Sequence, residues 1–282
     1  MKNKFKQILK KIFFKANLYI LINIFKLLRD YLKVFKKPFL VNSSINNSFK
    51  FIGNTNVRDS VYEKEIKEFF LKIIKKNDLF INVGANYGYY CCLALSEGVR
   101  TIAFEPIYTN LRLLYKNIKI NNFDQNIDVF PIALGDRAEY KNIYGLSETA
   151  SLVKGWMSEN KSTDTIYCST MDKILNISDY KNKQILFLID VEGFEKKVLD
   201  GAINFIKMEK KPIWIMEVLY DLYDVKNFDY IDTFKHFFDN EYLCFDIQNN
   251  FKKINLEDLT VPISSNFLFI DKNKYKNILN TS

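Results

Sequence analysis

Glycine and histidine are scarce in this sequence, which contains nine glycines and a single histidine, His236, in 282 residues. His236 lies among phenylalanines in a helix predicted over residues 227–241, so we expect it to have a structural role. The four cysteines have no spacing typical of a zinc site, and two of them, Cys91 and Cys92, are adjacent. We therefore expect four free thiols in a reducing compartment.

Long apolar runs are also lacking. The longest uncharged run of the N-terminal segment covers ten residues, 16–25, whereas a membrane-spanning helix needs about 20. Lys15 interrupts the apolar stretch that a signal peptide would need, and no cleavage-site pattern follows it. This segment is therefore expected neither to cross a bilayer nor to act as a signal peptide.

Positive charge is concentrated at the N-terminus. Residues 1–40 contain eleven Lys/Arg and one acid, whereas the other 242 residues contain thirty Lys/Arg and thirty-two acids. A nucleic-acid enzyme more often carries its positive charge around the catalytic core, so we expect no nucleic-acid partner. Apolar residues at helical spacing predict an amphipathic helix, which either lies on an anionic membrane surface or packs on its own domain or a second subunit. The polar stretch 41–48 is the predicted boundary, so residues 1–48 are expected to form a basic helical arm and linker. The sequence does not fix an oligomeric state.

Short apolar runs alternate with helical patterns in the remainder of the chain, residues 49–282. Strands are predicted at 78–84, 100–106, 127–136, 184–193, 212–218, 242–247 and 266–271. Continuous apolar strands alternating with helices are typical of an α/β domain whose largely parallel sheet is covered on both faces. Ligands of such sheets bind outside the carboxyl ends of the strands.

One turn at this edge has the pattern of a nucleotide-cofactor site. The segment "INVGANYG" (81–88) places Gly84 and Gly88 directly after a buried strand, and Glu105 follows Gly84 by 21 residues at the end of the next strand. Glycine allows a tight turn and close approach of a ligand, and a carboxylate at Glu105 can accept both hydroxyls of a ribose. The turn lacks the G-x-G spacing that admits a pyrophosphate, and the sequence has no P-loop signature. These features favour S-adenosylmethionine, which has a ribose but no phosphate, over NAD.

Several segments, in order, resemble the FkbM family of S-adenosylmethionine-dependent O-methyltransferases. They are "FINVGANYGYY", "IAFEP", "PIALGD", "STMDKIL", "LFLIDVEGFEKKVLDGA", "IWIMEV" and "NFLFI", within residues 60–270. The resemblance implies the class I methyltransferase fold, a Rossmann-like α/β architecture with a seven-stranded, mostly parallel sheet whose last strand is antiparallel. It also implies acceptors that are commonly sugar or polyketide hydroxyls.

The cofactor site that this resemblance implies includes Asn82, Gly84, Ala85, Asn86, Gly88 and Glu105. The family usually has Asp at the position of Asn82, where it helps to hold the methionine end of the cofactor. Asparagine keeps an acceptor oxygen but loses the charge, so we expect weaker cofactor binding rather than none. Asp136, in "ALGD", is a candidate for the adenine side or an ordinary turn residue.

Carboxylates are the candidate catalytic groups. Removal of a proton from an alcohol acceptor needs a positioned base, and Asp190 and Glu192, in "DVEG", are the candidates. Glu217, in "MEV", is expected near Asp190 because their strands are neighbours in this fold, and the pair could hold Mg²⁺. Tyr144 and Trp156, in the polar passage 139–168, are candidates for acceptor recognition, or they belong to a surface loop.

The sequence thus predicts an O-methyltransferase that acts on a sugar hydroxyl of a glycan or glycolipid precursor in the cytoplasm, with a basic arm that could hold it at the inner membrane face. Two alternatives remain open. A catalytically silent relative that binds membranes or partner proteins is compatible with Asn82. An NAD-dependent oxidoreductase is disfavoured by the glycine pattern.

Overall fold

The computed structural model describes residues 35–44, 47–57, 63–145, 150–155, 162–219, 230–260, 265–274 and 278–279, together with Leu21, Leu28 and Leu32. The chain divides into two compact units, residues 1–37 and 38–282. The three isolated leucines of the first unit are helical, and most of the predicted amphipathic helix lies outside the described residues. No helix in the described part of the chain is long and apolar enough to cross a membrane.

The second unit begins earlier than the boundary predicted at residue 48. Strands β1 (Phe39–Asn42) and β2 (Ser48–Phe51) form an antiparallel hairpin within it. Phe49 and Phe51 are buried and contact the ring of Tyr89. The stretch expected to be a linker is therefore held to the second unit by apolar burial.

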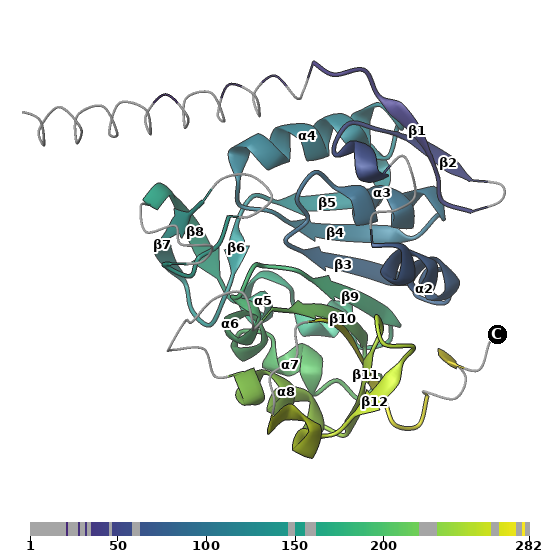
Figure 1. The fold of residues 1–282 in the computed structure, drawn as a ribbon, viewed down its shortest axis with the longest axis vertical. Helices are drawn as coiled ribbons and strands as arrows, with labels where there is room; N and C mark the ends of the chain where they lie inside the picture. The colour runs from purple at the N-terminus through teal and green to yellow at the C-terminus, as the bar shows by residue number, and fades with distance from the viewer. Residues whose placement is uncertain are drawn as a thin grey trace, which may run out of the picture. The chain divides into compact units, whose positions relative to one another are not determined.

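The second unit is built on an eight-stranded sheet with the order β12-β11-β13-β10-β9-β3-β4-β5 (Figure 1). Its strands are β3 (Leu79–Val83), β4 (Arg100–Phe104), β5 (Ile127–Phe130), β9 (Ile185–Ile189), β10 (Ile213–Val218), β11 (Tyr242–Asp246), β12 (Lys252–Ile254) and β13 (Ser265–Asp271). Strands β5, β4, β3, β9 and β10 are parallel, and β13 runs antiparallel to both β10 and β11. The predicted antiparallel last strand is confirmed. The sheet has eight strands rather than seven because β12 pairs with β11 as a hairpin at the edge.

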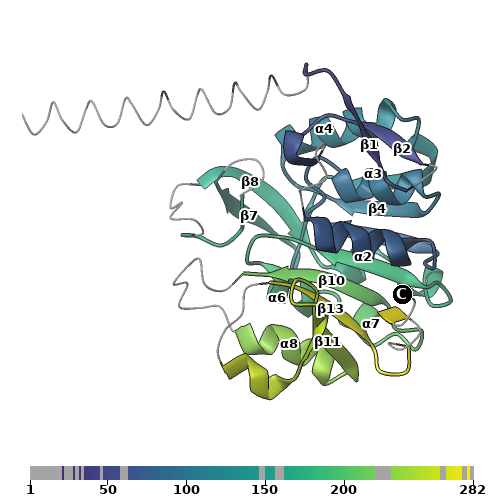
Figure 2. The same ribbon diagram turned by 45° about the vertical axis from the view of Figure 1, so that its right-hand side comes forward.

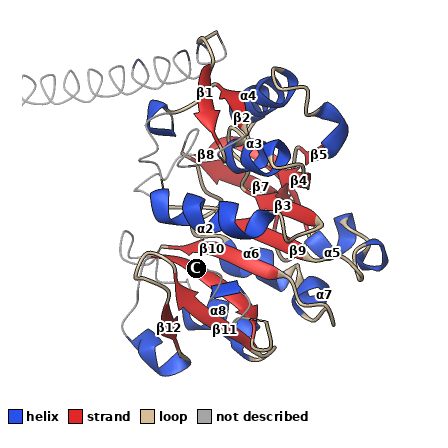
Figure 3. Ribbon diagram, turned by 90° about the vertical axis from the view of Figure 1, so that its right-hand side faces the viewer, coloured by secondary structure: helices blue, strands red, loops and turns tan. Residues whose placement is uncertain are grey.

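Helices cover both faces of this sheet (Figure 3). Their bounds are α2 (Lys64–Ile74), α3 (Tyr89–Ser96), α4 (Tyr108–Lys119), α5 (Met171–Ile174), α6 (Glu195–Asp200), α7 (Ile203–Ile206) and α8 (Tyr230–Phe238), with 3₁₀ turns η1 (Thr55–Val57), η2 (Asp124–Asn126), η5 (Ile177–Asp179) and η6 (Leu256–Thr260). Helices α3 and α4 pack on one face, and α6, α7 and α8 on the other. On this second face the rings of Phe187 and Trp214 stack, with centroids 3.9 Å apart. Successive side chains of β3 point to opposite faces of the sheet. Because all of its residues are buried, its sequence is an almost continuous apolar run rather than an alternating one.

A second, three-stranded sheet stands beside the main one, as the views in Figures 1 and 2 agree. It consists of β6 (Ala133–Leu134), β7 (Glu139–Tyr144) and β8 (Ser162–Ser169). The strand predicted over residues 127–136 is therefore wrong as a single element: Pro131, which has no N–H, separates β5 from β6. The predicted polar passage also contains the β7–β8 hairpin, in which Ile143 and Ile166 are buried beneath a polar outer face.

Candidate functional site

The candidate site lies where the strand order of the main sheet reverses. From β3 the chain continues to β4 and β5 on one side, and β9 and β10 lie on the other. The carboxyl ends of β3 and β9 diverge at this point and leave a crevice in which ligands of open α/β sheets bind. Asp190 N still donates to Val83 O at 3.0 Å, and the chain then separates into two turns, residues 84–88 and 190–193.

Gly84 makes this separation possible. Its φ of 82° is in the left-handed region, and a Cβ added there would lie 1.8 Å from Asp190 O. Gly84 N and Ala85 N both donate to Phe104 O, at 2.9 and 3.0 Å. The turn is therefore held between β4 and β9, and a side chain at position 84 would force these elements apart.

Two clefts open on either side of this turn, and both are lined by Gly84, Asn86 and Asp190. The first encloses about 610 Å³, including space open to solvent, and its further lining includes Glu105, Pro106, Ile107, Leu134, Glu192 and Phe194. The second encloses about 530 Å³, and its further lining includes Phe51, Asn54, Glu63, Asn82, Tyr89 and Tyr90. The structure thus brings most of the predicted cofactor residues to one edge of the sheet.

Glu105 directly follows β4 and holds other residues that line the first cleft in place through hydrogen bonds. Its side chain is 3% exposed. One carboxylate oxygen accepts from Asn86 N at 2.8 Å, and the other accepts from Ile107 N at 2.9 Å and Asn110 Nδ2 at 3.2 Å. Burial raises the pKa of Glu105 to about 7, although these hydrogen bonds favour the ionised form. Glu105 therefore connects the glycine turn to the start of α4, besides facing the cleft.

Asn82 lies within β3 and is 2% exposed. Its Nδ2 donates to Cys91 Sγ at 3.5 Å, which is a weak hydrogen bond, and its Oδ1 is buried without a partner among the described residues. Asn86 Oδ1 is likewise buried without a hydrogen-bond partner among the described residues. Buried polar atoms are nearly always hydrogen-bonded in proteins, so two orphaned acceptors beside one cleft indicate a place for a ligand that donates.

Three carboxyl groups cluster at the end of β9 and β10. Asp190 is partly buried, and its Oδ1 has no hydrogen-bond partner in the described part of the chain. Burial, followed by the charges of Glu217 and Glu192, raises the pKa of Asp190 well above its usual range. Burial also raises the pKa of Glu217. The predicted proximity of Asp190 and Glu217 is confirmed, and the two groups compete for protons as a pair.

The same cluster does not have the donor set of a metal site. Within the described ranges, no three His, Cys, Asp or Glu side chains are placed to hold a metal ion. Mg²⁺ prefers six oxygen ligands in an octahedron, and we therefore derive no step through it.

Glu195, which the sequence analysis did not single out, organises the turn after β9. It is 2% exposed, and its Oε1 accepts from Gly193 N at 3.0 Å and Val191 N at 3.4 Å. Its Oε2 is buried without a partner among the described residues, and burial raises the pKa of Glu195 to about 8. The only signal in the sequence was a third acid, two residues after "DVEG", which contains the other two.

Replacement of Glu195 by glutamine is expected to stabilise the protein at pH 8 and to leave it nearly unchanged at pH 5. Because the pKa of Glu195 is raised in the folded state, its protonated form supports the fold at low pH, and this support is lost as the pH rises toward 8. At about 1.4 kcal/mol per pH unit, the difference between pH 5 and 8 reaches at most about 4 kcal/mol. Urea unfolding at both pH values measures it, with the exposed Glu209→Gln as the matched control. Equal pH dependence in Glu195→Gln and the unaltered protein would contradict this.

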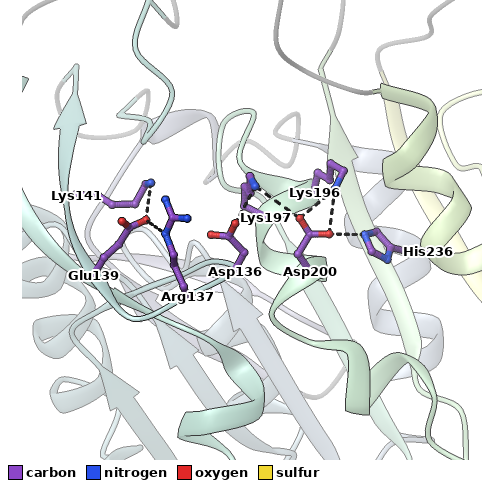
Figure 4. A network of polar contacts seen from close by, with 8 residues as sticks. All are labelled: Asp136, Arg137, Glu139, Lys141, Lys196, Lys197, Asp200 and His236. Atoms are coloured by element: carbon purple, nitrogen blue, oxygen red, sulfur yellow. Dashed lines mark hydrogen bonds and ion pairs between the residues drawn. The ribbon is translucent and has the colours of Figure 1, made fainter.

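Several predicted site residues lie outside both clefts. Asp136 forms an ion pair with Lys197, 2.8 Å long, in a network that continues through Asp200 to His236 (Figure 4). Although burial opposes it, the hydrogen bond and charge of Lys197 lower the pKa of Asp136. Asp136 therefore joins the turn after β6 to α6, and it is not among the residues that line either cleft.

Two further candidates, Gly88 and Tyr144, are also not among the residues that line the two clefts. Gly88 has a φ of 82° at the start of α3 and packs against Leu114, so it shapes the turn from outside the clefts. Tyr144 closes β7 by pairing its backbone with Ser151. Trp156 lies outside the described residues.

The strand order, the single antiparallel strand beside β10 and the crevice at the reversal define a class I methyltransferase fold. Residues 82–243 match the model of the Methyltransferase FkbM domain. The chain therefore belongs to the FkbM methyltransferase family.

Solved structures of low sequence identity are also similar. Methyltransferase FkbM from Methylobacillus flagellatus is 16% identical, with a TM-score of 0.43, over 78% of this chain and 56% of that one. The present chain thus spans little more than half the length of that relative. An O-methyltransferase from Bacillus cereus in complex with SAH is 11% identical, with a TM-score of 0.40, over 74% of this chain and 80% of that one. A SAM-dependent O-methyltransferase from Thermotoga maritima is 9% identical, with a TM-score of 0.39, over 79% and 72%. No curated protein matches the sequence.

Proposed function

We propose that this protein is an S-adenosylmethionine-dependent O-methyltransferase that acts on a sugar hydroxyl of a glycan or glycolipid precursor. The observation that carries the proposal is the meeting of three features at one sheet edge: Glu105, the turn from Gly84 to Asn86, and the Asp190–Glu217 pair. The first two suit a nucleoside, and the third suits removal of a proton.

The first cleft has the chemistry that the adenosine part of the cofactor requires. Glu105 has two oxygens that can accept the ribose hydroxyls in addition to their backbone donors, because each carboxylate oxygen has two lone pairs. Ile107 and Leu134 supply apolar contacts for a base. Gly84 exposes backbone to the ligand without a side chain in the way.

S-adenosylmethionine, when bound, supplies a methyl group already activated by a positively charged sulfur. The contribution required of the protein is then largely positional, since holding two reactants in line can supply about 7–11 kcal/mol. Asp190 belongs to both clefts and so lies where they join. An acceptor hydroxyl placed at this junction would face the carboxyl pair.

Asp190 and Glu217 together can act as the base. Burial raises the pKa values of both groups, and the charge of Glu217 raises that of Asp190 further, so the pair keeps one proton at pH values well above the usual range of a carboxyl. The ionised member then has a strong tendency to accept the proton of the acceptor hydroxyl. Glu192 lines the first cleft and remains the second candidate base.

A saccharide acceptor is supported by the β7–β8 hairpin. Its outward face carries exposed Tyr140 and Tyr167, whose rings meet edge to face at 5.5 Å. Beside them, Thr165 Oγ1 donates to Asn142 Oδ1 at 3.1 Å. Aromatic rings suit the apolar faces of sugar rings, and hydroxyl and amide groups suit sugar hydroxyls. Membrane contact through residues 1–40 stays a prediction.

Isothermal titration with S-adenosylmethionine, in parallel with NAD, tests the cofactor. We expect micromolar binding of the methyl donor, no binding of NAD, and at least about tenfold weaker binding of the methyl donor by Glu105→Ala. The exposed Glu68→Ala serves as the control for removal of a surface carboxylate. Binding of NAD alone would favour an oxidoreductase. Binding of neither ligand by a folded protein would favour the catalytically silent alternative.

A further inference from the structure

The turn after β9, residues 190–193, has a backbone conformation that a chain rarely adopts unaided. Glu192 and Gly193 both have positive φ angles, 55° and 91°. The left-handed region is strained for a residue with a Cβ, so this conformation persists only where the surroundings hold it. Because the turn carries Asp190 and Glu192, the two candidate bases, the groups that hold it decide where these carboxyls lie.

Two side chains from different segments hold the backbone of this turn. Glu195 accepts from the N–H groups of Val191 and Gly193, at 3.4 and 3.0 Å. Ser151 Oγ donates to the backbone oxygen of Glu192 at 2.5 Å. Glu195 directly follows the turn in the chain, whereas Ser151 precedes Glu192 by 41 residues. Of the two, Ser151 is therefore the contact that fixes the turn relative to a distant part of the chain.

Ser151 joins three parts of the structure. It is 1% exposed. Its backbone N–H and C=O pair with those of Tyr144 at the end of β7, at 2.9 and 2.8 Å. Its Oγ accepts from Val153 N at 3.0 Å, besides donating to the backbone of Glu192. One residue thus connects β7, the segment 150–153 and the turn that carries the candidate bases.

The surroundings of the Ser151 hydroxyl are largely apolar. Residues on both sides of it pack on the cluster that contains Phe194: Ala150, Leu152 and Val153. Ala150 and Leu152 also line the first cleft. Apolar packing is not directional, so by itself it allows the segment and the turn to shift against each other. A hydrogen bond is directional, and the hydroxyl of Ser151 therefore supplies a fixed point within this apolar contact.

We propose that Ser151 is a positioning residue for methyl transfer, which aligns the candidate bases with the first cleft through the backbone oxygen of Glu192. The inference rests on the proposed function, which gives the proton of the acceptor hydroxyl to Asp190 and the saccharide to hairpin β7–β8. Ser151 then connects the acceptor-binding hairpin to the base. Loss of its hydroxyl would keep the base in the site but no longer hold it in line with the acceptor.

Double-mutant cycles that combine Ser151→Ala with Asp190→Asn, and separately with Glu192→Gln, test this role. Alone, Ser151→Ala should lower kcat for transfer of a labelled methyl group to saccharide acceptors about 10- to 100-fold, since a misplacement of about 1 Å can cost 100-fold. Affinity for S-adenosylmethionine should stay within about threefold. Once the residue that acts as the base has been replaced, Ser151→Ala should change kcat by less than about twofold, because its effect passes through that base.

Ser43→Ala is the matched control. Ser43 is also buried, at 6% exposed, and its hydroxyl donates to the backbone oxygen of Asn47 at 3.1 Å, but it lines neither cleft. Its replacement should change kcat and cofactor affinity by less than about twofold.

Hydrogen exchange measures the hold on the turn without an acceptor. Ser151→Ala should speed amide exchange in residues 190–193 about tenfold, because the turn loses its long-range hydrogen bond. Ser43→Ala should leave exchange in the same residues unchanged.

Each other outcome has a distinct meaning. Equal slowing by Ser151→Ala with and without either base would show a general structural effect and overturn the role of Ser151, as would an unchanged kcat or a loss of cofactor affinity that matches the loss of rate. Unchanged exchange in residues 190–193 would overturn that role by itself. If the unaltered protein transferred no methyl group, the proposed function would fail, together with the catalytic part of this inference.

A second variant serves if Ser151→Ala folds poorly by thermal unfolding. Ser151→Cys keeps a donor of similar size, but a thiol donates more weakly than a hydroxyl. It should lower kcat about three- to tenfold and show the same dependence on the base. A kcat equal to that of the unaltered protein would contradict the proposal.

Discussion

The substitution Asp190→Asn is expected to slow methyl transfer by about 10²- to 10⁴-fold while S-adenosylmethionine still binds within about threefold of its normal affinity. Asparagine has nearly the same shape but cannot accept the proton of an alcohol. In the proposed site the cofactor would be held by Glu105 and the turn from Gly84 to Asn86, and these contacts would not depend on the charge of Asp190. Transfer of a labelled methyl group to saccharide acceptors, together with titration of the cofactor, separates the two effects.

The pH dependence of the reaction identifies the base. Burial and then the charge of Glu217 raise the pKa of Asp190, so the rate should increase as the pH rises and the pair loses its proton. Glu217→Gln removes the second cause and should move the rising limb to lower pH. Glu192→Gln is the comparison, because Glu192 is the competing candidate in the same cleft. If the limb moved with Glu192→Gln and stayed in place with Glu217→Gln, Glu192 would be the base.

The centre of the fold could be predicted because its local signals agree with its environment. Strands β3 and β9 are continuous apolar runs, and in the structure each is buried on both faces. The prediction that Gly84 and Glu105 meet at one edge depended only on parallel strands ending on the same side. The approach of Asp190 to Glu217 followed in the same way, because β9 and β10 are neighbours in register.

The walls of the site could not be predicted in this way, since they come from distant segments with weak patterns. The hairpin β1–β2 has strands of four residues each, and it contributes Phe51 to the second cleft. Strand β7 of the second hairpin has a single buried residue, Ile143, among its six, so its sequence shows no regular apolar–polar alternation. Glu63 reaches the cleft from a turn whose position depends on how α2 packs, and a local sequence pattern does not encode this packing.

The second large effect is expected for Gly84→Ala, which should lower the free energy of unfolding by about 2 to 5 kcal/mol and abolish measurable binding of S-adenosylmethionine. Two costs contribute. An L-residue is strained at a φ of 82°, and the new Cβ would lie 1.8 Å from Asp190 O. That oxygen belongs to the backbone of the neighbouring turn, so relief requires the turns after β3 and β9 to separate.

Gly98→Ala separates these two costs. Gly98 has nearly the same φ, 83°, but a Cβ there would have no atom within 4 Å. It should therefore show only the backbone cost of about 1 to 2 kcal/mol and leave cofactor binding intact. Urea unfolding of both variants, followed by titration with the cofactor, gives the contribution of the contact as the difference between them. Equal destabilisation would mean that the crevice tolerates a wider separation of β3 and β9, and the close approach of Asp190 to the glycine turn would then not be needed for the fold.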